Sequence, residues 1–245
     1  MKRFLSAIAA FVFATTSASA GQPKPAASIA DLDARLGAML RDAHIPGASV
    51  ALIENGQATF TRGYGYADLA RRIPATADTP FRAGSISKSF TSIAIMTLVE
   101  QRKLSLDETL AQFAPDVHFV NPWEQTNPVR LGNLLEHTTG WPDIGTRVLA
   151  KDEKSWSVLQ GVQFSSPEFV SRWAPGRFMV YNNAGPAVAA VALERASGKS
   201  FDDYLRDDVL RPMGMPTADF ALPPQLASRR ATRPTGEKRP ISTSC

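Results

Sequence analysis

The chain has several segments with helical spacing of apolar residues and one short stretch with the character of strands. Residues 48–53 and 57–61 are rich in apolar and β-branched residues, and Glu54-Asn55-Gly56 separates them. Asn-Gly between two apolar runs favours a tight turn, so this stretch predicts a β-hairpin. Helical spacing together with start and stop residues predicts helices at 29–43, 129–136, 186–196 and 201–210.

Helix starts can be predicted from polar residues that cap free backbone N–H groups. Ser28 stands three residues before Asp31, and Ser105 three before Glu108, which in both cases is typical of a capping box. The run Ser165-Ser166-Pro167-Glu168 predicts a further helix start, because proline suits the first helical position. The middle of the chain is therefore expected to be mostly helical.

A long apolar helix is predicted after Ser85, with one face formed by Phe90, Ile93, Ala94, Thr97 and Leu98. Ser85 and Lys88 are three residues apart at its start, and residues at this spacing share one face of a helix. A hydroxyl becomes a good nucleophile only when a neighbour accepts its proton, and a lysine of lowered pKa can do so. Ser85 could equally be a simple N-cap and Lys88 a surface lysine.

Three short motifs distinguish these alternatives. Ser85-Ile86-Ser87-Lys88 and Tyr181-Asn182-Asn183, with His137-Thr138-Thr139-Gly140 between them, resemble the serine β-lactamase and penicillin-binding protein superfamily. The branch with a Tyr-x-Asn motif is most similar: class C β-lactamases, D-alanyl-D-alanine carboxypeptidases and related esterases. The resemblance implies an α/β (α+β) fold of the β-lactamase/transpeptidase type, with a helical lobe beside an antiparallel sheet.

The resemblance also implies roles for single residues. Ser85 would be the nucleophile, Lys88 its proton partner, Tyr181 a second proton carrier, and Asn183 a group that orients the substrate carbonyl and bonds to Lys88. Tyr181 could instead be an ordinary half-buried tyrosine. His137 could be the base of a serine–histidine pair, but its surroundings are similar to a structural turn of the family, so we expect a structural role.

No metal or organic cofactor is implied. The three histidines, His44, His118 and His137, are scattered without the ligand spacing of a metal site. The net charge of +4 is concentrated at the ends, since residues 21–220 carry 20 basic and 22 acidic side chains. A nearly neutral body does not favour nucleic acid as a partner. We expect instead a small-molecule or peptidoglycan-derived substrate and a monomer.

Both ends of the chain are expected to lie outside the fold. Residues 1–20 combine Lys2 and Arg3 with an apolar run and Ala18-Ser19-Ala20, which is typical of a secretory signal peptide. We therefore expect a periplasmic or secreted protein with no membrane span after cleavage. The single cysteine, Cys245, excludes a disulfide within the chain. Residues 223–245 are basic, proline-rich and without hydrophobic period, so we expect a disordered tail.

The hydrolase domain is then expected at residues 21–222, as the N-terminal portion of a family domain. The third motif of the family, Lys-Thr-Gly or a relative such as His-x-Gly, is absent from this sequence, and Pro234-Thr235-Gly236 is only a partial match. The sequence therefore looks truncated, with only the first hairpin of the sheet present and with doubtful activity as given. Three functions are compatible with it: an exported serine hydrolase acting on a β-lactam, D-Ala-D-Ala peptide or small ester, a non-hydrolytic penicillin- or peptidoglycan-binding protein, or an inactive fragment.

Overall fold

The computed structural model describes residues 24–143 and 156–220, in which a small antiparallel sheet precedes a helical body. The predicted signal peptide, the predicted tail, Pro234-Thr235-Gly236 and Cys245 lie outside the described residues. The elements are α1 (Ile29–Asp42), β1 (Gly47–Glu54), β2 (Gln57–Asp68), β3 (Ile73–Pro74), the 3₁₀ turn η1 (Gly84–Ile86), α2 (Ser87–Glu100), α3 (Leu110–Phe113), α4 (Leu131–Leu135), α5 (Val158–Ser165), the 3₁₀ turn η3 (Ser166–Glu168), α6 (Ala184–Ser197), α7 (Phe201–Tyr204) and the π-helix η4 (Leu205–Leu210).

The N-terminal helix and the hairpin form where local sequence predicts them. The Ser28 hydroxyl accepts a hydrogen bond from the Asp31 N–H at 3.1 Å and so caps α1. Strands β1 and β2 pair antiparallel, and Asn55 and Gly56 turn between them with φ of 51° and 75°. Positive φ at both turn residues explains why Asn-Gly occurs here.

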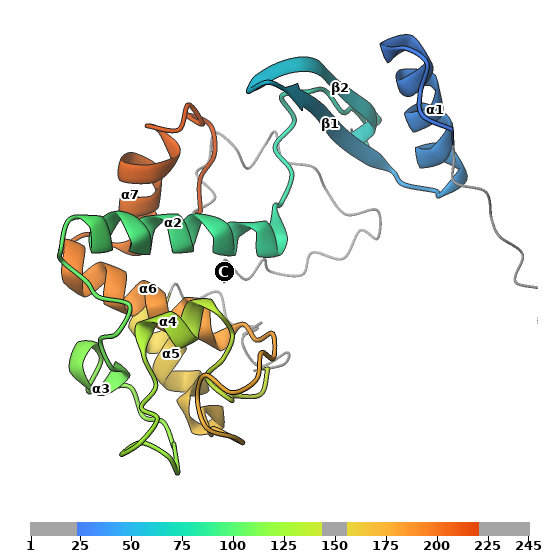
Figure 1. Ribbon diagram of the computed structural model, residues 1–245. Helices are drawn as coiled ribbons and strands as arrows, with labels where there is room; N and C mark the ends of the chain where they lie inside the picture. The colour runs from blue at the N-terminus through green and yellow to red at the C-terminus, as the bar shows by residue number, and fades with distance from the viewer. Residues whose placement is uncertain (1–23, 144–155, 221–245) are drawn as a thin grey trace, which may run out of the picture.

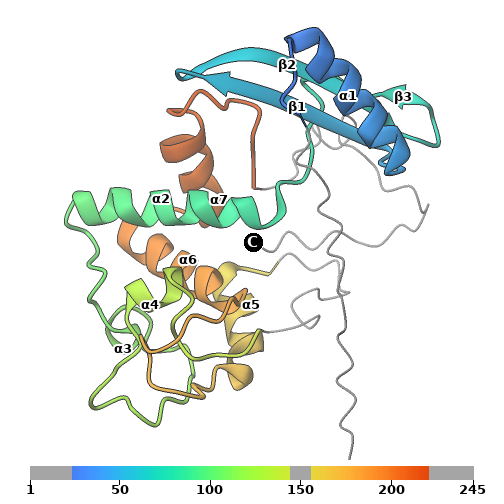
Figure 2. The same ribbon diagram turned by 45° about the vertical axis from the view of Figure 1, so that its right-hand side comes forward.

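The sheet has one more strand than the sequence analysis predicted. Strand β2 continues to Asp68, and the two-residue strand β3 pairs with its end, Tyr66 opposite Pro74 (Figure 2). Two residues are too short to give a periodic signal, so only pairing in the folded chain defines β3. The order β1-β2-β3 makes a three-stranded antiparallel sheet.

The buried core lies in the helical body. In Figure 1, α2 runs above α6, with α4 and α5 below, and the buried side chains of α2 and α6 include Ile95, Leu98, Val188 and Leu193. Burying a side chain of this size contributes about 1.5–3 kcal/mol. Helix α6 also brings Gly185 against the backbone of α4, where a Cβ atom would lie 2.4 Å from the Leu134 carbonyl oxygen. The absence of a side chain at Gly185 therefore permits this close packing.

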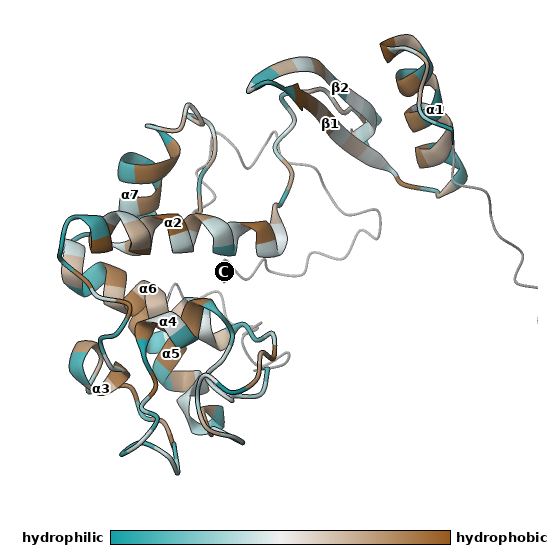
Figure 3. Ribbon diagram, in the orientation of Figure 1, coloured by the Kyte–Doolittle hydropathy of each residue, from teal (hydrophilic) through white to brown (hydrophobic). Residues whose placement is uncertain are grey.

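Apolar residues also occur outside the core. Figure 3 shows hydrophobic positions on α1 and β1, and α1 has no buried residue. Ile29, Met39 and Ile53 are exposed. Within residues 24–143 and 156–220, no helix is long and apolar enough to cross a membrane.

The helix predicted to start at Ser105 is wrong in its position. The Ser105 hydroxyl accepts a hydrogen bond from the Asp107 N–H at 3.2 Å, which closes a local turn instead of a helix cap. The helix starts at Leu110, where Gln112 accepts from the Thr109 N–H at 2.8 Å. The predicted helix 129–136 is shortened to Leu131–Leu135, because Val129 and Arg130 are held against the 108–110 segment by backbone bonds and a bridge.

The prediction of a helix start at Ser165 is also wrong. A helix ends there instead: α5, which the sequence analysis missed, spans Val158–Ser165, and only the single 3₁₀ turn η3 follows. Phe169 leaves helical geometry with ψ of 67°, and Val170 forms a bridge with Val120. Pairing with a distant segment therefore overrides the local preference for a helix after Pro167.

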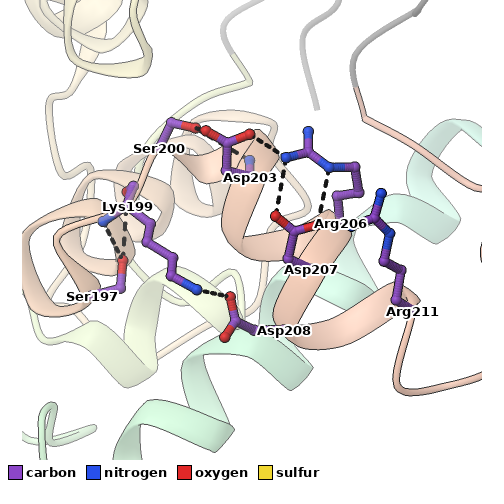
Figure 4. Close-up of polar contacts among 8 residues, drawn as sticks. All are labelled: Ser197, Lys199, Ser200, Asp203, Arg206, Asp207, Asp208 and Arg211. Atoms are coloured by element: carbon purple, nitrogen blue, oxygen red, sulfur yellow. Dashed lines mark hydrogen bonds and ion pairs between the residues drawn. The ribbon is translucent and has the colours of Figure 1, made fainter.

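The predicted helix 201–210 is present but changes type. The Ser200 hydroxyl accepts from the Asp203 N–H at 3.2 Å and caps α7, and the chain continues as the π-helix η4. Figure 4 shows the polar side chains on this segment: Lys199 donates to Asp208 at 2.6 Å, and Arg206 bonds to Asp203 and Asp207. These pairs are largely exposed, so each contributes little to stability.

Candidate active site

Ser85 lies at the junction between the sheet and the helical body. It is the second residue of η1, directly before α2, and its side chain is exposed. Gly84 precedes it with φ of 56°, a left-handed conformation that glycine adopts without steric cost. The first N–H groups of a helix have no partner within it and carry partial positive charge, so Ser85 lies where developing negative charge is stabilised.

Lys88 contacts both predicted polar partners. Its ammonium donates to the Ser85 hydroxyl at 3.2 Å and to Asn183 Oδ1 at 2.7 Å. The first contact follows from the spacing of three residues on one helix. The second joins the start of α2 to the start of α6, which are 95 residues apart.

Tyr181 completes the contacts of the serine oxygen. Its hydroxyl donates to Ser85 Oγ at 2.5 Å, and the Lys88 ammonium lies 5.0 Å from the centre of its ring. Hydrogen bonding with Lys88, and then with Ser85, lowers the pKa of the Tyr181 hydroxyl. A tyrosine with a lowered pKa gives up its proton more readily, which suits it to exchange a proton with Ser85.

The segment that carries Tyr181 and Asn183 is fixed by its neighbours. The Val180 N–H donates to the His137 carbonyl at 2.9 Å, and the buried Asn182 accepts from the Gly185 N–H at 2.8 Å. Asn182 thereby caps the start of α6, so the side chains on either side of it are held in place.

Asp143 belongs to this cluster, although the sequence analysis did not select it. Its Oδ1 accepts from the Asn183 backbone N–H at 3.0 Å and from Asn183 Nδ2 at 3.1 Å. The only signal in the sequence is its place just after Gly140-Trp141-Pro142. One acidic residue after a turn is too common to indicate a site.

His137 lies beside the cluster and contacts its backbone. The ring is 4.6 Å from that of Tyr181 between centroids, and Nδ1 accepts from the Asn182 N–H at 3.4 Å. Burial, and then the nearby Lys88 charge, lower the pKa of His137. Its φ of 59° places it in a tight turn. These contacts fit a residue that supports the Tyr181 segment.

The four residues selected from the sequence, Ser85, Lys88, Tyr181 and Asn183, are thus brought together by the fold. The part of the chain that the structure describes contains no group of three or more His, Cys, Asp or Glu residues placed to hold a metal ion. The arrangement provides a nucleophilic oxygen, a cation and a phenol within hydrogen-bonding distance of one another.

This fold and these motifs define a class of protein, and comparison with known proteins agrees with it. Residues 31–245 match the family model described as Beta-lactamase, so the chain belongs to the beta-lactamase family within the serine β-lactamase and penicillin-binding protein superfamily. The match includes residues 223–245, for which the sequence predicts a disordered tail. The predicted β-lactamase/transpeptidase-like fold is confirmed.

The individual relatives share less than a third of their aligned residues with this chain, and each of them is longer than it is. Protein flp of Staphylococcus aureus (strain MW2) is 28% identical over 182 residues, which cover 74% of this chain and 36% of flp. The octameric penicillin-binding protein homologue of Pyrococcus abyssi has a TM-score of 0.67 and 30% identity, covering 77% of this chain and 43% of its own. D-amino acid amidase of Ochrobactrum anthropi, solved with D-phenylalanine, has a TM-score of 0.66 and 30% identity, covering 82% and 56%. The chain thus spans only part of the length of the relatives that it matches.

Proposed function

We propose that this member of a hydrolase family is an exported serine hydrolase that acts through an acyl-enzyme on an amide or ester carbonyl. The observation that carries the proposal is the pair of contacts on Ser85 Oγ, from Lys88 Nζ at 3.2 Å and from the Tyr181 hydroxyl at 2.5 Å. A serine with two proton-carrying neighbours can be activated without a histidine or a metal ion.

In the proposed reaction, Tyr181 first loses its hydroxyl proton to solvent. Ser85 Oγ then attacks the carbonyl carbon, and the Ser85 proton passes to the Tyr181 phenolate. The adjacent Lys88 ammonium favours that phenolate. The tetrahedral intermediate collapses when the bond to the leaving group breaks, and the Tyr181 hydroxyl returns the proton to the departing nitrogen or oxygen. Water then attacks the ester on Ser85 by the same route and releases the acid. The partial positive charge at the start of η1, where Ser85 lies, supports stabilisation of the oxyanion.

Asn183 would orient two groups, the Lys88 ammonium and the carbonyl of the substrate. Its Oδ1 accepts from Lys88, and one of its two Nδ2 hydrogens is directed to Asp143. An amide nitrogen carries two hydrogens, so the second can donate to the carbonyl of a bound substrate.

The substrate class and the location are part of the proposal. We propose a β-lactam, a D-Ala-D-Ala peptide or a small ester as the substrate. The similarity to a D-amino acid amidase supports an amide bond, and that to a penicillin-binding protein homologue supports a penicillin-like compound. The N-terminal sequence supports export to the periplasm or secretion. We retain a monomer as the expected state, which size-exclusion chromatography with light scattering would test.

A non-hydrolytic penicillin- or peptidoglycan-binding protein is the second candidate. The likeness to a penicillin-binding protein homologue favours it. Such a protein would form the acyl-enzyme and release it very slowly, so the two candidates differ only in the second half of the reaction.

The experiment is to incubate the purified full chain with a fluorescent penicillin and, separately, with a nitrophenyl ester. We expect labelling at Ser85, located by mass spectrometry, and loss of labelling in Ser85→Ala. Steady release of nitrophenol would support the hydrolase, whereas a burst of one equivalent without turnover would support the binding protein. A well-folded chain that neither labels at Ser85 nor releases nitrophenol would contradict both.

A further inference from the structure

Asp143 makes an unusual pair of contacts at the candidate site. A single oxygen, Oδ1, accepts from both the backbone N–H and the side-chain Nδ2 of Asn183, at 3.0 and 3.1 Å. The Asn183 side chain reaches the Lys88 ammonium with its other end, at 2.7 Å. Asp143 therefore reaches Lys88 through one intervening amide.

These contacts select one of the two orientations of the Asn183 amide. As observed, the amide NH₂ faces the carboxylate and the amide oxygen faces the ammonium, so each end meets a group of opposite character. Rotation by half a turn would place oxygen against the Asp143 carboxylate and NH₂ against the Lys88 ammonium. Both contacts would then be repulsive, and charge-assisted hydrogen bonds would be lost at both ends.

We propose that Asp143 is a positioning residue that fixes the Asn183 amide and, through it, the Lys88 ammonium beside Ser85. The inference rests on the proposed function, because positioning Lys88 matters for the reaction only if Ser85 is acylated. Without Asp143, the Asn183 side chain can turn, and Lys88 loses the acceptor at 2.7 Å that holds it. A catalytic group displaced by about 1 Å can reduce a rate about 10²-fold.

A purely structural role for Asp143 is the alternative to be distinguished. A carboxylate near the start of α6 also stabilises that helix, since the N-terminal end of a helix attracts negative charge. Glu194 provides a matched control at a different helix start. Its Oε1 accepts from the Phe201 N–H at 2.9 Å at the beginning of α7. Glu194 follows Asn183 by 11 residues along α6, which corresponds to about 16 Å along a helix.

The first measurement does not depend on activity. Nuclear magnetic resonance measures the chemical shift and the solvent exchange of the Asn183 side-chain amide protons. We would compare these in the full-chain wild type and in the variants Asp143→Ala, Asp143→Asn and Glu194→Ala. We expect Asp143→Ala to shift the Asn183 amide protons upfield and to speed their exchange with solvent. Asp143→Asn, which retains an acceptor oxygen, should restore most of the wild-type signal, and Glu194→Ala should leave it unchanged. An Asn183 signal that is identical in wild type and Asp143→Ala would overturn the proposal.

The second measurement is the acylation rate per folded molecule with a fluorescent penicillin and a nitrophenyl ester. We expect Asp143→Ala to reduce it about 10²-fold, and Asp143→Asn to recover at least part of this loss. In an Asn183→Ala background, Asp143→Ala should change the rate by less than about threefold, because its effect passes through the missing amide. Losses that multiply in the double variant would overturn the proposal, because Asp143 would then act independently of Asn183.

These measurements distinguish a wrong role for Asp143 from a wrong proposed function. If wild type acylates neither probe although it is folded, the proposed function fails, and the Asn183 amide signals still decide whether Asp143 orients that side chain. If wild type acylates Ser85 and the amide signals or the double variant contradict the expectation, only the role of Asp143 is rejected.

Discussion

At the scale of single residues, the start of α2 and the segment before α6 meet at the Ser85 oxygen. Lys88 reaches it from the same helix, and Tyr181 reaches it from the segment before α6. A half-buried lysine and a tyrosine with a lowered pKa form one unit that can accept and return a proton. The residues of such a unit depend on one another, which can be tested directly.

The first prediction concerns this dependence. Ser85→Ala and Lys88→Ala should each reduce acylation by several orders of magnitude, and the double variant should be little slower than either single variant. Fluorescent-penicillin labelling rates of the full chain measure the effect. Lys103→Ala serves as the control, because Lys103 is exposed in the loop after α2. Multiplying losses would show that the two residues act separately.

The second prediction concerns His137 and pH. Its pKa in the folded chain is lowered, first by burial, so the folded state resists a proton that the unfolded chain takes up near its ordinary pKa of about 6.5. The stability linked to His137 is therefore fully present above pH 6.5 and is lost as the pH falls through that value toward the lower folded pKa.

His137→Asn tests this relation, since asparagine tolerates the left-handed backbone with φ of 59°. Urea unfolding between pH 7.5 and pH 5 should show a smaller loss of stability in the variant than in wild type. The acylation rate per folded molecule of His137→Asn should differ from that of wild type by a smaller factor than its folding equilibrium constant does. A large loss of rate with unchanged unfolding would instead support His137 as a base.

At the scale of elements, α6 connects the core to the site. It ends at Gly198, whose φ of 71° suits a helix end, and it begins beside Asn183. Its close approach to α4 at Gly185 sets the position of that beginning. A small displacement of α6 would therefore be transmitted to Tyr181 and Asn183.

The third prediction compares two glycines in helices. Gly185→Ala would place a Cβ 2.4 Å from the Leu134 carbonyl oxygen, so we expect a loss of about 1–3 kcal/mol in unfolding free energy and slower acylation. In Gly161→Ala, within α5, the new Cβ would meet nothing within 4 Å, and alanine favours a helix by up to about 1 kcal/mol. Thermal unfolding of both variants provides the measurement. Equal effects at the two sites would contradict the close packing at Gly185.

At the scale of the whole molecule, the sheet and the helical body differ in how much they bury. The core cluster runs from Ala94 to Val209 and contains no residue of β1 or β2, and α1 buries none. Figures 1 and 2 both place α1 and the hairpin to one side of the helices, joined to α2 by the segment that leads to Ser85. Local stability depends on buried apolar contacts, so these two parts should open with different free energies.

The fourth prediction follows from this difference. Backbone amides of β1 and β2 should exchange with solvent faster than those of α6, which is the more deeply buried element. Hydrogen exchange of the full chain, followed by mass spectrometry of peptides from the two regions, measures it. Equal protection would show that the sheet and the helices unfold as one unit.

The sequence by itself determined the features that depend on near neighbours. Asn55-Gly56 defines the hairpin turn, Ser28 and Ser200 cap their helices, and Gly198 ends α6, because each depends on backbone geometry within a few residues. The contact of Ser85 with Lys88 belongs to the same group, since a spacing of three residues determines it.

Only the tertiary structure decided the features that depend on distant partners. Tyr181 is 96 residues from Ser85, and it was selected through a family resemblance, not through any local spacing. Asp143 was missed because its partner, Asn183, lies 40 residues away. Ser105 and Ser165 predicted helix starts that the folded chain does not use. The Leu106 and Glu108 carbonyls accept from the Gly132 and Leu131 N–H groups, and Val170 pairs with Val120 where the second helix was expected. Local preferences amount to about 1 kcal/mol, so tertiary contacts of similar or larger energy can override them.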